Sequence, residues 1–453
     1  MAPRVAIVGA GPAGAFAAAS LLRMHPQVEI DLLERLPTPW GLLRGGVAPD
    51  HQEIKRLEDT FDLQTLGAGC RFLGNVDVGV DVSHAELMDH YVAVVYATGA
   101  QTDKSLGIPG EELAGSWPAT EFVAWYNGHP DFRELEFDLS ARRAVVIGNG
   151  NVAADVTRML TLSADDLART DVADHALGAL RESRIEEVVV LGRRGPAQAA
   201  FTSAELRELG RIPGVELRVR RDEVALDPLS RRWLTDQGSF TARKNVQLLG
   251  EFAAAAPLAG ARRRIELRFL RSPVAINGVD KVESIDVRGN QIVQAEDGQL
   301  RAEAAVDAVE TIECGLVLRS VVYRAVPLPG VPFDERYFVL PNERGRVLDA
   351  DGTPVTGVYA VGWIKRGPTG ILGTNKRDAD ETIECVVEDL GSLRSPARHI
   401  DALLAERCPD LVTVEGWRAI EARELTAGRQ QQRPRVKLAS RDELLATAAR
   451  SPA

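Results

Sequence analysis

The sequence has few cysteines, and no two of them are close enough along the chain to share a site. Among its 453 residues the four cysteines stand at positions 70, 314, 385 and 408, and no Cys-x-x-Cys pair occurs. This spacing predicts no disulfide framework, no zinc site or other metal centre, no iron–sulfur cluster and no dithiol redox centre. We therefore expect a protein of a reducing compartment.

Long apolar runs and an excess of positive charge are also lacking. No run approaches the roughly 18 residues of a membrane-spanning helix, and the segment RVAIVGAG begins at residue 4, which leaves no room for a signal peptide. A formal net charge of −11 argues against a nucleic-acid-binding protein. The sequence thus predicts a cytoplasmic protein that binds neither nucleic acid nor membrane.

Glycine, in contrast, is abundant. Forty glycines, a hydrophobic content of 45% and only 5% aromatic residues favour an α/β protein with many tight turns between strands and helices. The chain is longer than the roughly 250–300 residues that one hydrophobic core supports. Two or three domains are therefore expected.

The first glycine-rich segment, VAIVGAGPAGAFAAASLLRM, begins as an apolar strand and continues as an alanine-rich helix. In the pattern Gly9-x-Gly11-x-x-Gly14, the first glycine permits the tight turn. The second lets the backbone approach a pyrophosphate, and the third lets helix and strand pack closely. The next strand ends in Glu34, 20 residues after Gly14, where a carboxylate accepts hydrogen bonds from ribose hydroxyls. A turn that only packs tightly does not explain Glu34, so we predict a dinucleotide site.

A second segment, ARRAVVIGNGNVAADVTRML, repeats this design with Gly-x-Gly-x-x-Ala at 148–153. The strand that follows, EEVVVLGRRG, ends in Arg193 and Arg194, at the place that Glu34 takes in the first fold. A carboxylate suits a free 2′-hydroxyl, whereas a guanidinium pair matches the geometry and charge of a 2′-phosphate. A solvated strand end is the alternative. The contrast predicts FAD at the first site and NADP(H) at the second.

The middle of the chain indicates that one nucleotide fold is inserted into the other. An apolar strand at 91–100 leads into a loop, and the chain returns near 357–383, where a glycine-rich turn precedes a helix whose N-terminus suits a polar part of the flavin. We predict an α/β protein with two Rossmann-like, doubly wound domains. Residues 1–103 and 326–453, with a C-terminal tail, form the FAD domain, and residues 104–325 form the inserted NADP domain.

Together these motifs resemble the adrenodoxin-reductase type of ferredoxin–NADP reductases, including its bacterial members. The resemblance rests on LPTPWGLLRGGVAPDH, VIGNGNVAADV, GRRGPAQAAFTSAELREL, VGWIKRGPTGILGTNK and the late PRVKLAS. It implies that NADPH gives a hydride to FAD and that the reduced flavin passes single electrons to a ferredoxin-type iron–sulfur protein. Such a protein can in turn supply a cytochrome P450.

The resemblance also implies two sets of cofactor-binding residues. The FAD set is Gly9, Gly11, Pro12, Ala13, Gly14, Glu34, Leu42, Val78, Trp363, Gly370, Ile371 and Leu372. The NADP set is Asn149, Gly150, Asn151, Val152, Arg193, Arg194 and Glu205, with Gly370 near the nicotinamide.

Three polar residues are the candidates for catalytic groups near the reacting rings, from their place in the family's motifs: His51, Asp155 and Glu205. Hydride transfer needs the nicotinamide C4 held about 3–3.5 Å from the flavin N5, and no nucleophile is expected. Without its motif, His51 would be interpreted as an ordinary surface or core histidine. The alternative for Asp155 is a carboxylate that only complements the helix dipole.

A cationic docking surface is expected if the electron acceptor is an acidic ferredoxin. Arg207 and Arg211 lie four positions apart on the helix expected after FTSAEL, where the family contacts its partner; a solvated face is the alternative. Two other functions compete with ferredoxin reduction. One is a flavin oxidase, monooxygenase or diaphorase that acts directly on a small molecule, and the other is a nucleotide-binding sensor without catalysis.

Overall fold

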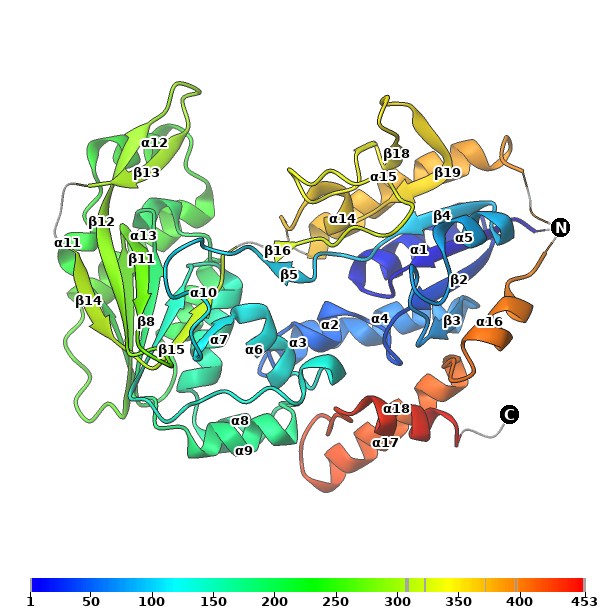
Figure 1. Ribbon diagram of the computed structural model, residues 1–453. Coiled ribbons are helices and arrows are strands. Elements are labelled where there is room, and N and C mark those ends of the chain that lie inside the picture. Colours follow the sequence, from blue (N-terminus) through cyan, green and yellow to red (C-terminus); the bar gives the residue numbers. More distant parts are fainter. Residues whose placement is uncertain are drawn as a thin grey trace. The chain divides into compact units, whose positions relative to one another are not determined.

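The computed structural model describes residues 2–305, 309–321, 323–370, 372–394, 396 and 398–450. The chain divides into two compact units, each drawn in Figure 1. Unit 1 comprises Met1–Thr102, Asn127–Arg133 and Val322–Ala453, and unit 2 comprises Asp103–Tyr126 and Glu134–Val321.

One segment departs from the predicted domain boundaries. Residues 127–133, expected inside the inserted domain, belong to unit 1. The Asn127 Oδ1 atom accepts hydrogen bonds from the Lys55 and Lys437 ammonium groups, both at 3.1 Å, and Asp131 pairs with Arg35 at 2.5 Å. These contacts join distant parts of the chain, so local sequence pattern does not reveal them. As a result the chain crosses between the units four times instead of twice.

Unit 1 is built on a seven-stranded sheet. Its strands are β1 (Arg4–Val8), β2 (Glu29–Glu34), β3 (Arg71–Gly74), β4 (Ala93–Tyr96), β17 (Asn342–Glu343), β18 (Arg346–Leu348) and β19 (Pro354–Ala360). The strand order is β17-β18-β19-β4-β1-β2-β3. From β19 to β3 all neighbours are parallel, and β17 and β18 add an antiparallel edge. The inner strands are almost wholly apolar because helices and core side chains cover both faces of the sheet.

Two long helices cover one face of this sheet. Helix α1 (Pro12–Met24) packs against α15 (Leu372–Leu390), as Figure 1 shows. The other helical segments of unit 1 are α2 (Leu42–Gly45), α3 (Gln52–Lys55), α4 (Leu57–Gln64), η1 (Leu66–Ala68), α5 (His84–His90), η2 (Pro130–Phe132), α14 (Trp363–Arg366), α16 (Asp401–Arg407), α17 (Val414–Gln430) and α18 (Arg441–Ala448). The two short strands at the crossings of the chain are β5 (Thr102–Asp103) and β16 (Tyr323–Arg324).

Unit 2 has a six-stranded parallel sheet and a smaller antiparallel one. The parallel strands are β6 (Ser116–Pro118), β7 (Arg143–Ile147), β8 (Glu187–Gly192), β9 (Val215–Val219), β10 (Arg263–Phe269) and β15 (Leu316–Arg319), in the order β6-β15-β7-β8-β10-β9. The antiparallel strands are β11 (Arg271–Asn277), β12 (Ser284–Gln294), β13 (Leu300–Ala304) and β14 (Glu310–Glu313). The helical segments are α6 (Ala119–Tyr126), α7 (Asn151–Thr161), α8 (Ala164–Leu167), α9 (Asp174–Glu182), η3 (Pro196–Gln198), α10 (Ser203–Leu209), α11 (Arg221–Val224), α12 (Pro228–Asp236) and α13 (Phe240–Ala254).

In both sheets the strand order reverses beside the strand that leads into a glycine loop. The strand order reverses between β1 and β4 in unit 1, and between β7 and β15 in unit 2. The N–H of Gly9 donates to the Leu33 carbonyl at 2.8 Å, and the N–H of Gly148 donates to the Leu191 carbonyl at 2.9 Å. Doubly wound sheets bind their ligands at such reversals. The predicted fold class, two Rossmann-like α/β folds with one inserted into the other, is confirmed.

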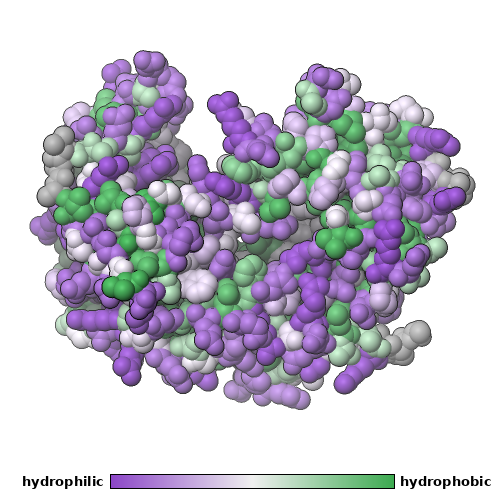
Figure 2. Space-filling model, in the orientation of Figure 1, coloured by the Kyte–Doolittle hydropathy of each residue, from purple (hydrophilic) through white to green (hydrophobic). Residues whose placement is uncertain are grey.

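Apolar residues mainly fill the cores of the two units. Among the residues that the structure describes, no helix combines the length and the apolar character needed to cross a bilayer. On the face drawn in Figure 2, hydrophilic residues predominate and apolar ones lie in small separate groups. The nucleotide folds therefore present a largely polar surface on this face.

Candidate functional site

The first glycine loop joins β1 to α1 at the strand-order reversal of unit 1. Gly9 has a φ of +107°, and a Cβ there would stand 2.6 Å from the Ala97 carbonyl oxygen. A Cβ on Gly14 would stand 2.0 Å from the Gly9 carbonyl oxygen. Gly11 is the N-cap of α1, and Pro12 is its first helical residue, where proline's missing N–H costs nothing. The loop thus leads closely packed into the N-terminus of α1, where free backbone N–H groups favour an anion.

Glu34 stands at the end of β2 beside this loop. Its carboxylate accepts hydrogen bonds from the N–H of Ala10 at 2.9 Å and the N–H of Leu36 at 3.0 Å. Burial raises the pKa of Glu34, and these two N–H groups act in the opposite direction. A carboxylate has about four lone-pair positions, so Glu34 retains acceptor capacity while it anchors the loop.

The segment before α2 packs directly on the first loop. Gly41 has a φ of +45°, and a Cβ there would stand 2.9 Å from the Gly11 Cα. Leu42 follows it at the start of α2 and is 41% exposed, so its side chain is accessible to a ligand. Val78 is instead buried in the core cluster against which Trp363 packs. His51 precedes α3 and is half-buried.

The glycine-rich return segment contacts the same helix. Gly362 has a φ of +78°, and a Cβ there would stand 2.5 Å from the Ala13 Cβ. The Gly362 N–H donates to Asp378 at 2.5 Å, which fixes the start of α14 and with it Trp363. Gly370 has a φ of +87° and precedes α15. Of the other two positions predicted in this segment, Ile371 lies outside the described residues and Leu372 is the first residue of α15.

The second glycine loop joins β7 to α7 in unit 2. Gly148 has a φ of +124°, and a Cβ there would stand 1.9 Å from the Ser320 carbonyl oxygen. Gly150 is the N-cap of α7, and apart from its own helix and chain neighbours no heavy atom of the described residues lies within 4 Å of the position its Cβ would take. The Asn149 Nδ2 atom is buried and has no hydrogen-bond partner in the part of the chain that the structure describes. A buried donor beside an open glycine fits a nucleotide that brings an acceptor.

A short segment ties this loop to α10. The Asn149 carbonyl accepts a hydrogen bond from the Phe201 N–H at 2.9 Å, and the Asn151 Oδ1 atom accepts one from the Thr202 N–H at 2.8 Å. Thr202 is also the N-cap of α10. Asn151 and Val152 are the first residues of α7, so hydrogen bonds join the segment before α10 to the start of α7.

Two of the predicted catalytic residues meet on one buried arginine. Arg158 of α7 is 2% exposed, and its guanidinium donates to Asp155 at 2.6 Å and to Glu205 at 2.5 Å. Carboxylates that share a buried guanidinium are fixed in place. This arrangement favours a positioning role for Asp155 and Glu205; a catalytic role for them, or for His51 of unit 1, stays a prediction.

Arg193 and Arg194 lie in the turn between β8 and η3. Arg193 is exposed and Arg194 is half-buried. Neither guanidinium has a hydrogen-bond or ion-pair partner among the described residues. Burial lowers the pKa of Arg194, and the neighbouring Arg193 lowers it further. Two adjacent cations without an acidic partner form a site that a bound anion stabilises.

Sequence reasoning missed two residues of this second site. A Cβ on Gly192 would stand 2.5 Å from the Asn149 Nδ2 atom, so glycine is required there for steric reasons. The other is Arg158. Its partner Glu205 lies on α10, 47 positions further along the chain, so sequence proximity does not link the two residues. The glycine at 192 could have been predicted from the GRRG motif, whereas no local sequence pattern indicates the role of Arg158.

The predicted helix carrying Arg207 and Arg211 is shorter than expected. Helix α10 ends at Leu209, where Gly210 follows, so Arg211 lies beyond the helix. The expectation of both arginines on one helix is therefore wrong, because glycine ends the helix early. Arg207 is half-buried and Arg211 is exposed.

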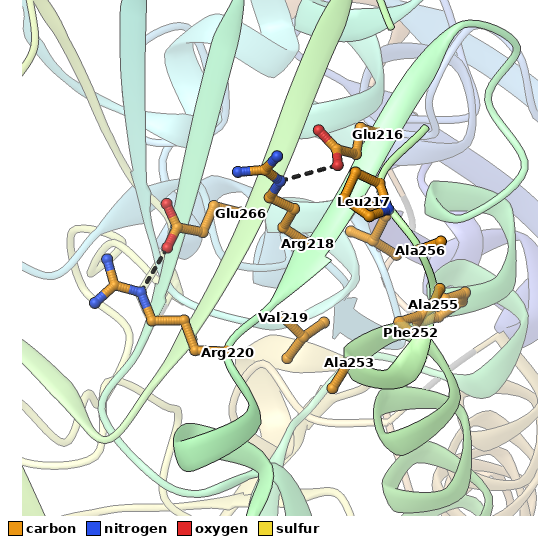
Figure 3. A pocket seen from close by; sticks show the side chains of 11 residues that line it. Glu216, Leu217, Arg218, Val219, Arg220, Phe252, Ala253, Ala255, Ala256 and Glu266 are labelled. Carbon is orange, nitrogen blue, oxygen red and sulfur yellow. Dashed lines mark hydrogen bonds and ion pairs between the residues drawn. The ribbon is translucent and has the colours of Figure 1, made fainter. Parts of the chain in front are cut away.

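A separate cavity of about 400 Å³ lies beside the edge strand β9 (Figure 3). It is lined by β9, the end of α13 and Glu266 of β10. Arg218 pairs with Glu216 at 2.9 Å, and Arg220 pairs with Glu266 at 2.8 Å, as Figure 3 shows. No predicted site residue lines this cavity, and β8 and β10 separate its strand from β7 and the second glycine loop.

Known proteins similar to this chain were found by sequence and by structure. Residues 3–191 match the family of pyridine nucleotide-disulphide oxidoreductases. The chain is 47% identical to NADPH-ferredoxin reductase FprA of Mycobacterium leprae, over 97% of each chain. It is 40% identical to the mitochondrial NADPH:adrenodoxin oxidoreductase of Arabidopsis thaliana, over 98% of this chain and 95% of that one.

The structural similarity is equally extensive. Mycobacterium tuberculosis FprA in complex with NADPH superposes with a TM-score of 0.93 at 46% identity, over 99% of this chain and 100% of that one. All four cysteines of the present chain are free and buried. By identity and by coverage of both nucleotide folds, the chain belongs to the adrenodoxin-reductase type of NADPH-ferredoxin reductases.

Proposed function

We propose that this chain is an FAD-dependent oxidoreductase that takes a hydride from NADPH and delivers single electrons to a ferredoxin-type iron–sulfur protein. The observation that carries this proposal is the presence of two complete dinucleotide cradles whose strand-end residues differ in charge. When bound, the flavin would accept a hydride and release its two electrons one at a time. Nicotinamide does not release single electrons in this way.

Unit 1 would hold FAD. Its glycine loop offers backbone N–H groups at the N-terminus of α1 to the pyrophosphate, and Glu34 accepts from a ribose hydroxyl. Leu42, Val78, Trp363 and Gly370–Leu372 are the proposed contacts around the remainder of the cofactor. The cradle fits because a Cβ at Gly9 or Gly14 would collide with backbone.

Unit 2 would hold NADPH. The loop at 148–153 receives the pyrophosphate, and the unpartnered Asn149 amide donates to the ligand. Arg193 and Arg194 bind the 2′-phosphate. Their guanidinium groups have no acidic partner among the described residues, and the phosphate supplies the negative charge. The carboxylates of Asp155 on α7 and Glu205 on α10 are oriented by the Arg158 guanidinium and lie on the two helices next to this loop.

The test is anaerobic stopped-flow reduction of the bound flavin by NADPH and by NADH. Charged hydrogen bonds contribute about 1.5–3 kcal/mol each, so Arg193→Ala and Arg194→Ala should each lower kcat/KM for NADPH by about 10-fold or more. The value for NADH should not change. Arg181→Ala, at an exposed arginine of α9, controls for net charge. Equal losses with both nucleotides would refute the assignment of the 2′-phosphate.

The partner surface is proposed to be acidic and to contact the region of Arg207 and Arg211. Charge reversal at these residues should slow reduction of a ferredoxin at low salt, and added salt should reduce the difference. Reduction of ferricyanide, a small acceptor that needs no docking surface, should keep its rate. An equal effect of Arg181→Glu would show that only net charge matters. The free cysteines suit a reducing location, and we place the protein in the cytoplasm.

A further inference from the structure

A strained corner lies next to the arginine pair in unit 2. Leu270 stands between β10 and β11, where the chain leaves the parallel sheet for the antiparallel one. Its φ is +55°, a left-handed conformation that leucine rarely adopts. Such a conformation persists only where the surrounding structure holds it, and it occurs most often at functional sites.

Hydrogen bonds on both sides of Leu270 hold this corner. Glu223 of α11 is 4% exposed, and its carboxylate accepts from the Arg268 guanidinium at 2.9 Å, the Phe269 N–H at 2.8 Å and the Arg271 guanidinium at 3.1 Å. One buried carboxylate therefore fixes the residues before and after the strained position.

From this corner a chain of hydrogen bonds reaches both arginines. The Leu270 N–H donates to the Arg194 carbonyl at 3.1 Å, and the Asn290 N–H donates to the Leu270 carbonyl at 2.8 Å. The Asn290 Nδ2 atom donates to the Arg193 carbonyl at 2.8 Å and to the Ser272 hydroxyl at 2.7 Å. The Arg193 carbonyl is thus held by a residue of the antiparallel sheet, and the Arg194 carbonyl is held by the corner residue between the two sheets.

This arrangement fixes the backbone from which two long side chains extend. A flexible turn would have to be ordered when the anion binds, and a backbone that is already fixed avoids this cost, so that only the arginine side chains remain to be ordered. The amide of Asn290 is neutral, so it holds the turn without supplying a charge that would compete with a phosphate for the guanidinium groups.

We infer that Asn290 is a positioning residue that presents Arg193 and Arg194 to the 2′-phosphate of NADPH, together with the Leu270 corner and Ser272. The inference rests on the proposed function of unit 2. Asn290 acts on the discrimination between NADPH and NADH, and the flavin chemistry does not depend on it.

The experiment measures KM and kcat of the flavin-loaded protein for NADPH and NADH. Losing one hydrogen bond that orders the turn should raise KM for NADPH about fivefold in Asn290→Ala, with kcat and the KM for NADH unchanged. The isosteric Asn290→Asp keeps the shape of the side chain and places a carboxylate beside the arginines, and its KM for NADPH should rise further. Asn277→Ala is the matched control, because Asn277 also donates to a serine of the same antiparallel sheet, Ser284, at 3.4 Å.

A second arm combines Asn290→Ala with Arg193→Ala and Arg194→Ala. If Asn290 acts through the arginines, it should add no further loss in that background. Unchanged NADPH preference in both Asn290 variants, or an equal loss in Asn277→Ala, would overturn the inference while the proposed function stands. If the arginine variants themselves leave the preference unchanged, the proposed NADP site fails first.

Discussion

The two glycine loops are built alike in their backbone and differ in the charge at the strand that follows. Gly9 and Gly148 both have positive φ and both donate to the end of the neighbouring strand. Glu34 is engaged by two backbone N–H groups, whereas Arg193 and Arg194 have no side-chain partner among the described residues. The two backbones thus form similar cradles, and under the proposed function the strand-end side chains would distinguish the substituents of the bound riboses.

The third position of each loop shows a second difference. A Cβ on Gly14 would stand 2.0 Å from the Gly9 carbonyl oxygen. Ala153 carries a Cβ at the equivalent place and is fully buried. Helix α1 therefore approaches its loop more closely than α7 approaches the second loop. The sequence motif allows either glycine or alanine at this third position, so it does not reveal the difference.

Exchanging the third residues should have the largest effect. Gly14→Ala cannot avoid the Gly9 carbonyl without moving α1, so we expect nearly complete loss of bound FAD. The measurement is the ratio of flavin to protein absorbance after gel filtration. The reciprocal Ala153→Gly should lose about 1–2 kcal/mol of stability, from helix propensity and one buried methyl group, and keep its KM for NADPH. Full flavin content in Gly14→Ala would contradict the difference between the loops.

Removing the buried arginine of the second site comes next. Arg158→Leu leaves the Asp155 and Glu205 carboxylates without their shared partner, and breaking such a buried pair costs about 3–5 kcal/mol. Urea unfolding monitored by fluorescence measures the loss. Arg158→Lys should recover part of it, and Arg44→Leu in unit 1 gives a comparison, because Arg44 pairs with the fully buried Glu424 at 2.6 Å. A loss below about 1 kcal/mol would mean that the pair behaves as a surface contact.

A smaller effect on NADPH binding should follow from Asn149→Ala, which gives the second loop the same second residue as the first. Asn149 stands where the first loop has Ala10. Since the Asn149 amide has no partner in the described chain, Asn149→Ala should leave stability within about 0.5 kcal/mol. KM for NADPH should rise about fivefold if the ligand supplies the acceptor. A large loss of stability with unchanged KM would show that this amide serves the protein alone.

The smallest effect is a difference in pH dependence. Burial raises the pKa of Glu34, and in the proposed FAD site a ribose hydroxyl would donate to the ionised carboxylate. FAD binding must then expel a proton at low pH, so FAD affinity should fall as the pH drops through that raised pKa, and Glu34→Gln should lack this fall. NADP+ affinity should fall below about pH 6 because the phosphate itself gains a proton. Fluorescence titrations should show no such step with NAD+ at the second site.

The sequence predicted the loops and the charge contrast because both depend on short stretches of chain. A positive φ at glycine, a strand that precedes it and a helix that follows it are all local. The ion pairs of Asp155 and Glu205 with Arg158 were not predicted, because side chains from separate helices meet there only after folding. The early end of α10 at Gly210 was missed although a local signal was present.

Local sequence patterns predicted two doubly wound folds, their family and the opposite charges at their strand ends. Contacts that form on folding place residues 127–133 in unit 1, bring Glu205 and Asp155 onto one buried arginine, and let Asn290 hold the arginine turn from 97 positions away. Periodicity and turn preferences act within a few residues. Contacts between distant segments depend on how the sheets bring those segments together.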